Sequence, residues 1–196
     1  MPWSAIIAET VWWMCVVVYL AIRFPHLRRA RSEPVRTSQR DFRDAFVRGF
    51  GVLTFAVLPF TYIVTDFPEF ATYPFFPPFA AIGAATFLAS LWCIHRSLQD
   101  LGRGFSPSLE IRHQHQLVTA GIYRQIRHPM YLGFLLWAIA QVMLLPNWIA
   151  GPAALVGWIV LFVARVGREE GMMLQEFGDQ YRAYMARTAR LVPGIF

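Results

Sequence analysis

The stretch MYLGFLLWAIAQVMLLPNWIAGPAALVGWIVLFVA, from Met130 to Ala164, decides the fold. It contains two apolar runs, Met130–Leu145 and Trp148–Ala164, which are separated only by Pro146 and Asn147. Each run approaches the ~17–25 residues that an α-helix needs to cross the apolar core of a bilayer. Because the connection is so short, we expect these two helices to form a tight antiparallel hairpin.

Three further apolar runs precede this hairpin, at Ala5–Ile22, Phe50–Thr65 and Pro77–Ile94. The chain has 196 residues, of which 56% are hydrophobic and only 15% charged, whereas about 25% of the residues of a soluble domain are charged. One such run fits a buried helix of a soluble protein, but five do not. We therefore predict an all-α, polytopic membrane protein with about five transmembrane helices, in which residues 1–196 form a single integral-membrane domain.

The first run is expected to be a retained membrane helix. It lacks the basic segment and small-residue cleavage site of a signal peptide, and Glu9 interrupts the part that would be apolar.

Arginine is distributed unevenly between the two sides of the predicted bundle. The chain has no lysine, and its 18 basic residues are all arginine. They lie in three segments, Arg23–Arg48, Arg96–Arg127 and Arg165–Arg190, while the connections 66–76 and 146–147 have none. The positive-inside rule places the N-terminus outside and the C-terminus in the cytoplasm. Between membrane spans, such arginines indicate contact with anionic lipid headgroups rather than with nucleic acid.

The hairpin brings two polar segments together at its open end. His128 precedes Pro129, a residue favoured in the first turn of a helix, so the histidine either caps the helix or helps the free N–H groups to hold an anion. Arg165 and Glu169 share a helix face, either as an ion pair at the helix end or as a grip on a zwitterionic or carboxylate ligand. Glu169 and Glu170 diverge by about 100°, so we expect one of them to face a site.

The remaining polar features favour simpler interpretations. The His113 and His115 spacing, without a nearby cysteine or carboxylate cluster, gives little support to a metal site, and we predict none. Cys15 and Cys93 fall inside spans, so no disulfide is expected. The loop Asp66–Phe79 is rich in aromatic residues and proline, which favours an interfacial aromatic belt over a pocket-lining segment.

After Arg165 the chain becomes amphipathic. We expect one or two helices there that lie on the cytoplasmic membrane surface or cap the hairpin, with a break at Gly178 and an end at Pro193 and Gly194.

Four motifs together resemble a known family. They are His115–Tyr123, Arg127–Gly133, Arg165 with Glu169-Glu170 four residues on, and Phe177–Tyr184 with its Phe-Gly-x-x-Tyr-x-x-Tyr pattern. Their order and spacing closely resemble the isoprenylcysteine carboxyl methyltransferase family, part of a wider group that includes phospholipid methyltransferases. The resemblance covers residues 105–193, the expected catalytic and cofactor-binding part.

The resemblance implies S-adenosylmethionine as the methyl donor, bound on the cytoplasmic side. It assigns catalytic roles to Arg165, facing the methyl acceptor, and to Glu169. The cofactor-binding residues that it implies are Glu110, His115, Gln116, Leu117, Val118, Tyr123, His128, Pro129, Met130, Tyr131 and Glu169.

The predicted function is methyl transfer to a lipophilic acceptor that enters from the bilayer, with the carboxylate of an isoprenylcysteine-like molecule as the implied acceptor. Three alternatives stay open. One is N-methylation of a phospholipid amine, with Glu169 or Glu170 as the base. The others are an NADPH-dependent sterol-type reductase, whose C-terminal region can share an R-H-P-x-Y turn, and a membrane scaffold without catalytic activity.

Overall fold

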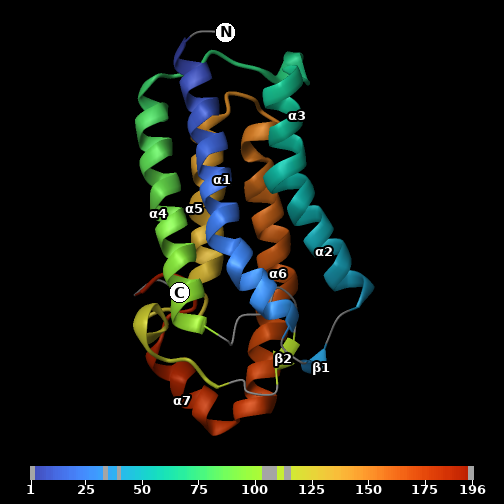
Figure 1. The fold of residues 1–196 in the computed structure, drawn as a ribbon, viewed down its shortest axis with the longest axis vertical. Coiled ribbons are helices and arrows are strands. Elements are labelled where there is room, and N and C mark those ends of the chain that lie inside the picture. The colour runs from blue at the N-terminus through green and yellow to red at the C-terminus, as the bar shows by residue number, and fades with distance from the viewer. Residues whose placement is uncertain (1–2, 33–34, 39–40, 103–109, 113–115, 194–196) are drawn as a thin grey trace.

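Long helices that run side by side make up most of the molecule (Figure 1). The computed structural model describes residues 3–32, 35–38, 41–102, 110–112 and 116–193. The helices are α1 (Trp3–Ser32), α2 (Phe42–Val52), α3 (Leu58–Thr65), α4 (Pro78–Leu101), α5 (Pro129–Leu144), α6 (Ala150–Phe177) and α7 (Asp179–Arg187).

Local signals set where these helices begin and end. Asp41 caps α2 through its side chain, which accepts a hydrogen bond of 2.7 Å from the backbone N–H of Asp44. Both α4 and α5 begin with proline, Pro78 and Pro129, which the first helical turn tolerates because its N–H groups have no partner inside the helix. Gly178, with φ of 51°, separates α6 from α7.

The helices α2 and α3 follow each other without a break and form one column of the bundle, but the helix type changes between them. A π-helical segment, η1 (Leu53–Val57), joins α2 to α3, and the column packs along α6. The contact is closest at Gly157, where a Cβ atom would collide with the Thr54 hydroxyl group. Small residues let the two backbones approach each other in this way. Because an inserted π turn rotates the helix faces on either side of it, η1 also changes which face of the column points inward.

The core lies where α4 and α5 pack against each other and α1 covers both. Its main apolar side chains are Trp12, Phe87, Ile94, Trp137 and Leu144. One fully buried amide lies among them: Gln141 accepts a hydrogen bond of 3.4 Å from Trp12 Nε1 and donates one of 2.8 Å to the carbonyl of Ala150. The amide therefore satisfies polar groups of α1 and α6 that would otherwise be costly to bury.

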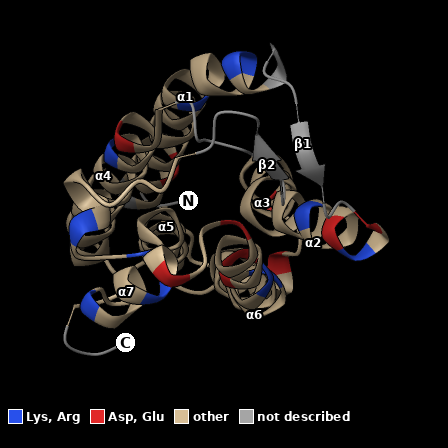
Figure 2. Cartoon of the chain, turned by 90° about the horizontal axis from the view of Figure 1, so that it is seen from below, with Lys and Arg blue, Asp and Glu red and all other residues tan. Residues whose placement is uncertain are grey.

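The helical, membrane-type fold is confirmed, with differences in length. The stretches Ala5–Ala30, Phe42–Thr65, Pro78–Leu101 and Ala150–Phe177 are long and apolar enough to cross a membrane, whereas α5 has only 16 residues. Within the described residues, the strands are those of a two-stranded antiparallel ladder, β1 (Val35–Ser38) and β2 (Glu110–Arg112), which the all-α prediction did not include. Seen from the α7 end, arginines mark this end of the bundle (Figure 2).

The one or two amphipathic helices predicted after Arg165 are present, and the predicted break at Gly178 is confirmed, but the first of them is not a separate helix. One helix of 28 residues, α6, runs past Arg165 to Phe177, and only α7 is separate. Gly167 and Gly171 do not interrupt it, although each glycine costs up to about 1 kcal/mol of helix propensity. Side-chain bonds from Glu169 and Glu170 to α5 and the turn before it hold this part of α6 in place, so tertiary contacts override the local preference.

The loop between α3 and α4 lies at the end of the bundle opposite α7 (Figure 1). It contains a short 3-10 helix, η2 (Glu69–Ala71), and it is tied to the α5–α6 connection by Asn147, whose Nδ2 donates to the carbonyl of Pro68 at 3.0 Å. Phe70 is 86% exposed. An exposed aromatic side chain at a bundle end fits the predicted interfacial belt.

Candidate active site

The turn before α5 is held by the C-terminal segment. The backbone N–H groups of Arg127 and His128 donate to the carbonyls of Ala189 and Arg190 at 2.8 and 3.1 Å, and Ala189 N–H donates back to Gln125 at 3.0 Å. This pairing is a short parallel bridge between chain segments about sixty residues apart. It fixes the backbone of the His128–Pro129 turn, so the histidine has a defined position at the start of the helix.

Glu170 forms the buried centre of an ion-pair cluster. Its carboxylate lies 3.1 Å from Arg127 Nε, 3.3 Å from His128 Nε2 and 2.7 Å from Arg190 Nη2. The residue is only 5% exposed. A carboxylate buried to this extent requires such partners, and here they come from the turn before α5 and from the C-terminal segment. Glu170 therefore joins α6 to both of these segments.

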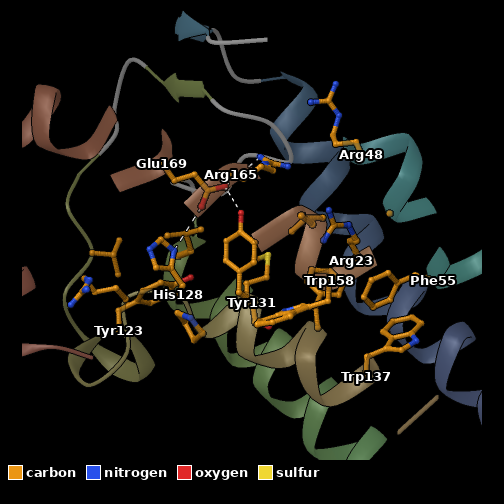
Figure 3. A pocket seen from close by; sticks show the side chains of 18 of the residues that line it. Arg23, Arg48, Phe55, Tyr123, His128, Tyr131, Trp137, Trp158, Arg165 and Glu169 are labelled. Atoms are coloured by element: carbon orange, nitrogen blue, oxygen red, sulfur yellow. Dashed lines mark hydrogen bonds and ion pairs between the residues drawn. The ribbon is translucent and has the colours of Figure 1, made fainter. Parts of the chain in front are cut away.

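Glu169 points to the other side of the histidine. Its carboxylate accepts a hydrogen bond of 2.8 Å from the Tyr131 hydroxyl and lies 3.4 Å from Arg165 Nη2 and 3.7 Å from His128 Nδ1 (Figure 3). Its side chain keeps 28% of its surface exposed. The histidine ring thus lies between two carboxylates, of which Glu169 is the one with accessible surface.

Arg165 carries two carboxylate partners on different helices. Besides Glu169 on its own helix, Asp44 of α2 places its Oδ1 atom 3.6 Å from Arg165 Nε. The Asp44 side chain is fully buried and also pairs with Arg48 one turn further along α2. A chain of alternating charges therefore runs from α2 through α6 to the turn before α5.

A cavity of about 630 Å³ lies among these groups. Its polar part includes Gln116, His128, Arg165 and Glu169, and its apolar part is lined by side chains of α1, η1 and α5, among them Phe55 and Trp137 (Figure 3). On one side the cavity is bounded by α1, which packs on α4 and α5, and on the other by α2 and η1, which pack on α6, while α5 and α6 also pack against each other. One cavity therefore joins a charged site to the apolar interior between the helices.

Two tyrosines in the cavity wall are neutral over the physiological pH range. Burial raises the pKa of Tyr123 far above its usual value and raises the pKa of Tyr184 to about 12. The Tyr184 hydroxyl donates to the carbonyl of Tyr123 at 2.7 Å, which links α7 to η4 (Gly121–Arg124). These phenols can therefore position groups and donate hydrogen bonds, but they do not supply a base at neutral pH.

The model of the isoprenylcysteine carboxyl methyltransferase (ICMT) family matches residues 79–175. Over this segment the chain belongs to the ICMT family. It is 41% identical over 97 residues to protein-S-isoprenylcysteine O-methyltransferase B of Arabidopsis thaliana, an alignment that covers 48% of this chain and 49% of the relative. It is 35% identical over 102 residues to the Schizosaccharomyces pombe protein-S-isoprenylcysteine O-methyltransferase, covering 50% and 43%.

A solved structure is similar as well. It is described as the eukaryotic intramembrane Ras methyltransferase ICMT, and it superposes with a TM-score of 0.53 at 26% identity, covering 77% of this chain and 52% of that one. The chain thus spans about half the length of the curated relatives it matches. The matched family segment runs from the start of α4 almost to the end of α6, so α1, α2 and α7 lie outside it.

The structure brings most of the predicted site residues to the cavity wall. The predicted residues that line it are Gln116, Leu117, Val118, Tyr123, His128, Pro129, Met130, Tyr131, Arg165 and Glu169. Glu110 lies in β2, but its side chain is outside the described part of the structure, and His115 is outside the described residues altogether. The predicted convergence of the His128 and Arg165 ends is confirmed, and Glu169 is the glutamate that faces the cavity.

Other residues at the site escaped the sequence interpretation. Arg23 of α1 and Arg48 of α2 line the cavity, and Asp44 lies directly behind Arg165. A signal for Asp44 was present, since an aspartate one turn before an arginine at the start of an apolar run suggests a local ion pair. That spacing gave no indication of a partner on α6. The pocket-lining alternative for Asp66–Phe79 is not supported, because the described residues that line this cavity include none from that loop.

Proposed function

We propose that this chain transfers a methyl group from S-adenosylmethionine to the carboxylate of a lipophilic, isoprenylcysteine-like acceptor. The observation that carries the proposal is the single cavity that joins the Glu169–His128 site to an apolar compartment, with Arg165 among the groups that line it. Membership of the ICMT family over residues 79–175 agrees with this activity. The names of the relatives support the class of acceptor.

The groups at the polar part of the cavity fit the proposed cofactor. The backbone of the segment 116–118 offers amide and carbonyl groups to a nucleobase, and the part-exposed Glu169 carboxylate offers a counter-charge to a cation. When bound, S-adenosylmethionine supplies an electrophilic methyl group on a positively charged sulfur. Glu169 stabilises positive charge nearby, while Tyr131 and Arg165 fix the position of the Glu169 carboxylate through the contacts described above.

Arg165 suits an acceptor that is a carboxylate. A planar guanidinium group binds a carboxylate through two parallel hydrogen bonds, and a carboxylate is ionised at pH 7. The acceptor then needs orientation and exclusion of water but no general base. Correct positioning alone accounts for a large share of the barrier reduction in such transfers, on the order of 7–11 kcal/mol in the most favourable intramolecular cases.

Methylation of an amine fits the site less well. An amine must lose a proton, which would require one of the two glutamates as a base. Glu170 is committed to Arg127, His128 and Arg190. Glu169 is held by Arg165 and Tyr131. Although burial raises it, the pKa of Glu170 is lowered to about 2 by the hydrogen bonds from His128, Arg190 and Arg127, so this carboxylate is a weak base.

The bundle geometry supports entry of the acceptor from the bilayer. Val16 and Leu20 of α1 and Val52 of α2 line the cavity, and Val52 is 60% exposed. An apolar chain would therefore meet an apolar path between α1 and α2. We propose that the polar cofactor enters from the end that carries β1, β2 and α7, which the distribution of arginine predicts to be cytoplasmic.

The test combines binding with turnover. We expect the purified protein to bind S-adenosylhomocysteine and to label a farnesylcysteine analogue from radiolabelled S-adenosylmethionine. His128→Ala and Glu169→Ala should each weaken S-adenosylhomocysteine binding by at least about tenfold, as expected when one partner of a partly buried charge contact is removed. Asp179→Asn, which removes an exposed ion pair with Arg182 on α7, is the control. Unchanged affinity in both site variants would exclude this assignment of the cofactor site.

A further inference from the structure

Asp44 lies in an environment that is costly for a charged side chain. It belongs to the first turn of α2, at the start of a stretch long and apolar enough to span a membrane. Its side chain has no exposed surface. An ionised carboxylate in such a place requires compensation by cations, and the pairs found for it are with Arg48 and Arg165.

The second of these pairs connects Asp44 to the proposed chemistry. Arg165 lines the cavity, whereas Asp44 does not. Oδ1 of Asp44 lies 3.6 Å from Arg165 Nε. Oε1 of Glu169 lies 3.4 Å from Arg165 Nη2, and Figure 3 shows these two side chains side by side. Two carboxylates on different helices thus contact two different nitrogen atoms of one guanidinium group. Neither contact is a hydrogen bond, since Arg165 Nε and both Asp44 oxygens have no such partner within the described residues, but two negative charges on different sides of the planar group restrict the orientations that it can adopt.

We propose that Asp44 is a positioning residue for Arg165 and thereby determines how the methyl acceptor's carboxylate is held. The proposal rests on the function proposed above. It assigns to α2, which lies outside the family-matched segment, a direct part in building the acceptor site. Without Asp44, Glu169 is the remaining carboxylate paired with Arg165, so the guanidinium group turns toward it and away from the acceptor.

A second ion pair on the same helix provides a matched control. Asp41, three residues before Asp44, pairs with Arg168, three residues after Arg165, at 2.9 Å. This pair also joins α2 to α6, but it is exposed, and neither residue lines the cavity. Asn at position 41 still caps the helix. Asp41→Asn therefore removes an α2–α6 ion pair of similar location without a contact to Arg165.

The experiment compares Asp44→Asn with Asp41→Asn in purified full-length protein. Asp44→Asn should lower kcat/KM for a farnesylcysteine analogue by about tenfold or more, mainly through a higher acceptor KM, as when one member of a buried charge contact is removed. S-adenosylhomocysteine affinity should change by less than about twofold, since its proposed contacts are intact. Asp41→Asn should stay within about twofold of the wild type in both quantities.

Three results would overturn the proposal. They are an unchanged acceptor kcat/KM in Asp44→Asn, an equal loss of acceptor and donor affinity with a lowered melting temperature, and an equal effect of Asp41→Asn. If Asp44→Asn does not fold, Asp44→Glu keeps the charge but displaces the carboxylate. It should then lower acceptor kcat/KM by about threefold with donor affinity retained, and a wild-type kcat/KM would again overturn the proposal.

Failure of the proposed function has a different signature. In that case the wild-type protein transfers no methyl group to the acceptor. The role of Asp44 is then judged by binding of the farnesylcysteine analogue, followed through the fluorescence of Trp137 and Trp158 in the cavity wall. Loss of this binding in Asp44→Asn alone supports the positioning role. Equal binding in all three proteins, or no binding to the wild type, overturns it.

Discussion

The polar end and the apolar end of the cavity differ in how closely the sequence specifies the residues that line them. At the polar end, His128, Tyr131 and Glu169 come from a segment with a recognisable motif that lies within the ICMT-matched region. At the other end, α1 and α2–η1 supply apolar side chains such as Val16, Leu20 and Phe55, which lie outside that region. A charged ligand requires particular groups at fixed positions, whereas a hydrocarbon chain requires only apolar volume. The comparison indicates that the proposed donor site is specified residue by residue and the proposed acceptor path mainly by shape.

The largest expected effect of a substitution is at Arg165, whose replacement tests whether the polar and apolar ends of the cavity act separately. Arg165→Lys keeps the charge but loses the planar fork, and we expect kcat/KM for the carboxylate acceptor to fall about 100-fold. S-adenosylhomocysteine affinity should change little. Arg168→Lys, one turn away in an exposed pair with Asp41, is the control and should retain activity. Equal loss of donor binding in Arg165→Lys would show that the two ends are not separable.

The stability of the polar end can be tested at Glu170. Glu170→Gln leaves Arg127 and Arg190 without their shared buried carboxylate, and we expect a loss of about 3 kcal/mol in the free energy of unfolding. Thermal denaturation in detergent measures it. Because Glu170 does not line the cavity, residual activity at low temperature should persist. Wild-type stability would mean that this cluster adds nothing to the fold, and the exposed Asp179→Asn should change stability by less than about 0.5 kcal/mol.

Much of the fold and part of the candidate site could be predicted from local sequence patterns. Three features depend on residues close in sequence or on a very short connection. They are the hairpin around Pro146 and Asn147, the helix start at His128–Pro129 and the Arg165–Glu169 pair. Hydropathy and i,i+4 spacing report such contacts directly.

The missed residues depend on contacts between distant segments. Asp44 meets Arg165 across more than a hundred residues, and Glu170 meets Arg190 through a chain reversal at Gly178. The charge pattern of a sequence shows that such residues are present, but it does not show which distant residues form ion pairs with them. For the same reason the sequence did not show that the amphipathic segment after Arg165 continues the preceding membrane helix as one helix, α6.

The shape of the apolar end can be tested by filling it. Gly51 of α2 lines the cavity, and a Cβ atom there would meet Leu161 Cδ1 at an ordinary contact distance of 3.6 Å. Gly51→Leu should therefore fold and reduce the space for an apolar chain. We expect acceptor kcat/KM to fall about tenfold, more for a geranylgeranyl than for a farnesyl chain, since pockets discriminate apolar groups by 1–3 kcal/mol.

The control for this substitution lies two residues away. Gly49→Leu adds the same side chain where nothing lies within 4 Å, and Gly49 does not line the cavity. Its kinetics should match the wild type. If Gly51→Leu lowers the affinity for S-adenosylhomocysteine as much as it lowers activity toward the acceptor, the two ends of the cavity are not independent.

The smallest expected effect concerns Tyr184, which holds α7 against the polar end. Tyr184→Phe removes its hydrogen bond to the Tyr123 carbonyl, and we expect a loss of about 1 kcal/mol at pH 8. Burial raises the pKa of Tyr184 to about 12 from an ordinary value of 10, so the folded state favours the neutral phenol. Its stabilising contribution is complete below pH 10 and disappears as the pH rises toward 12. The difference between the wild type and Tyr184→Phe should therefore shrink in denaturation curves above pH 10, and a constant difference would mean that the phenol is not ionised with unfolding in this range.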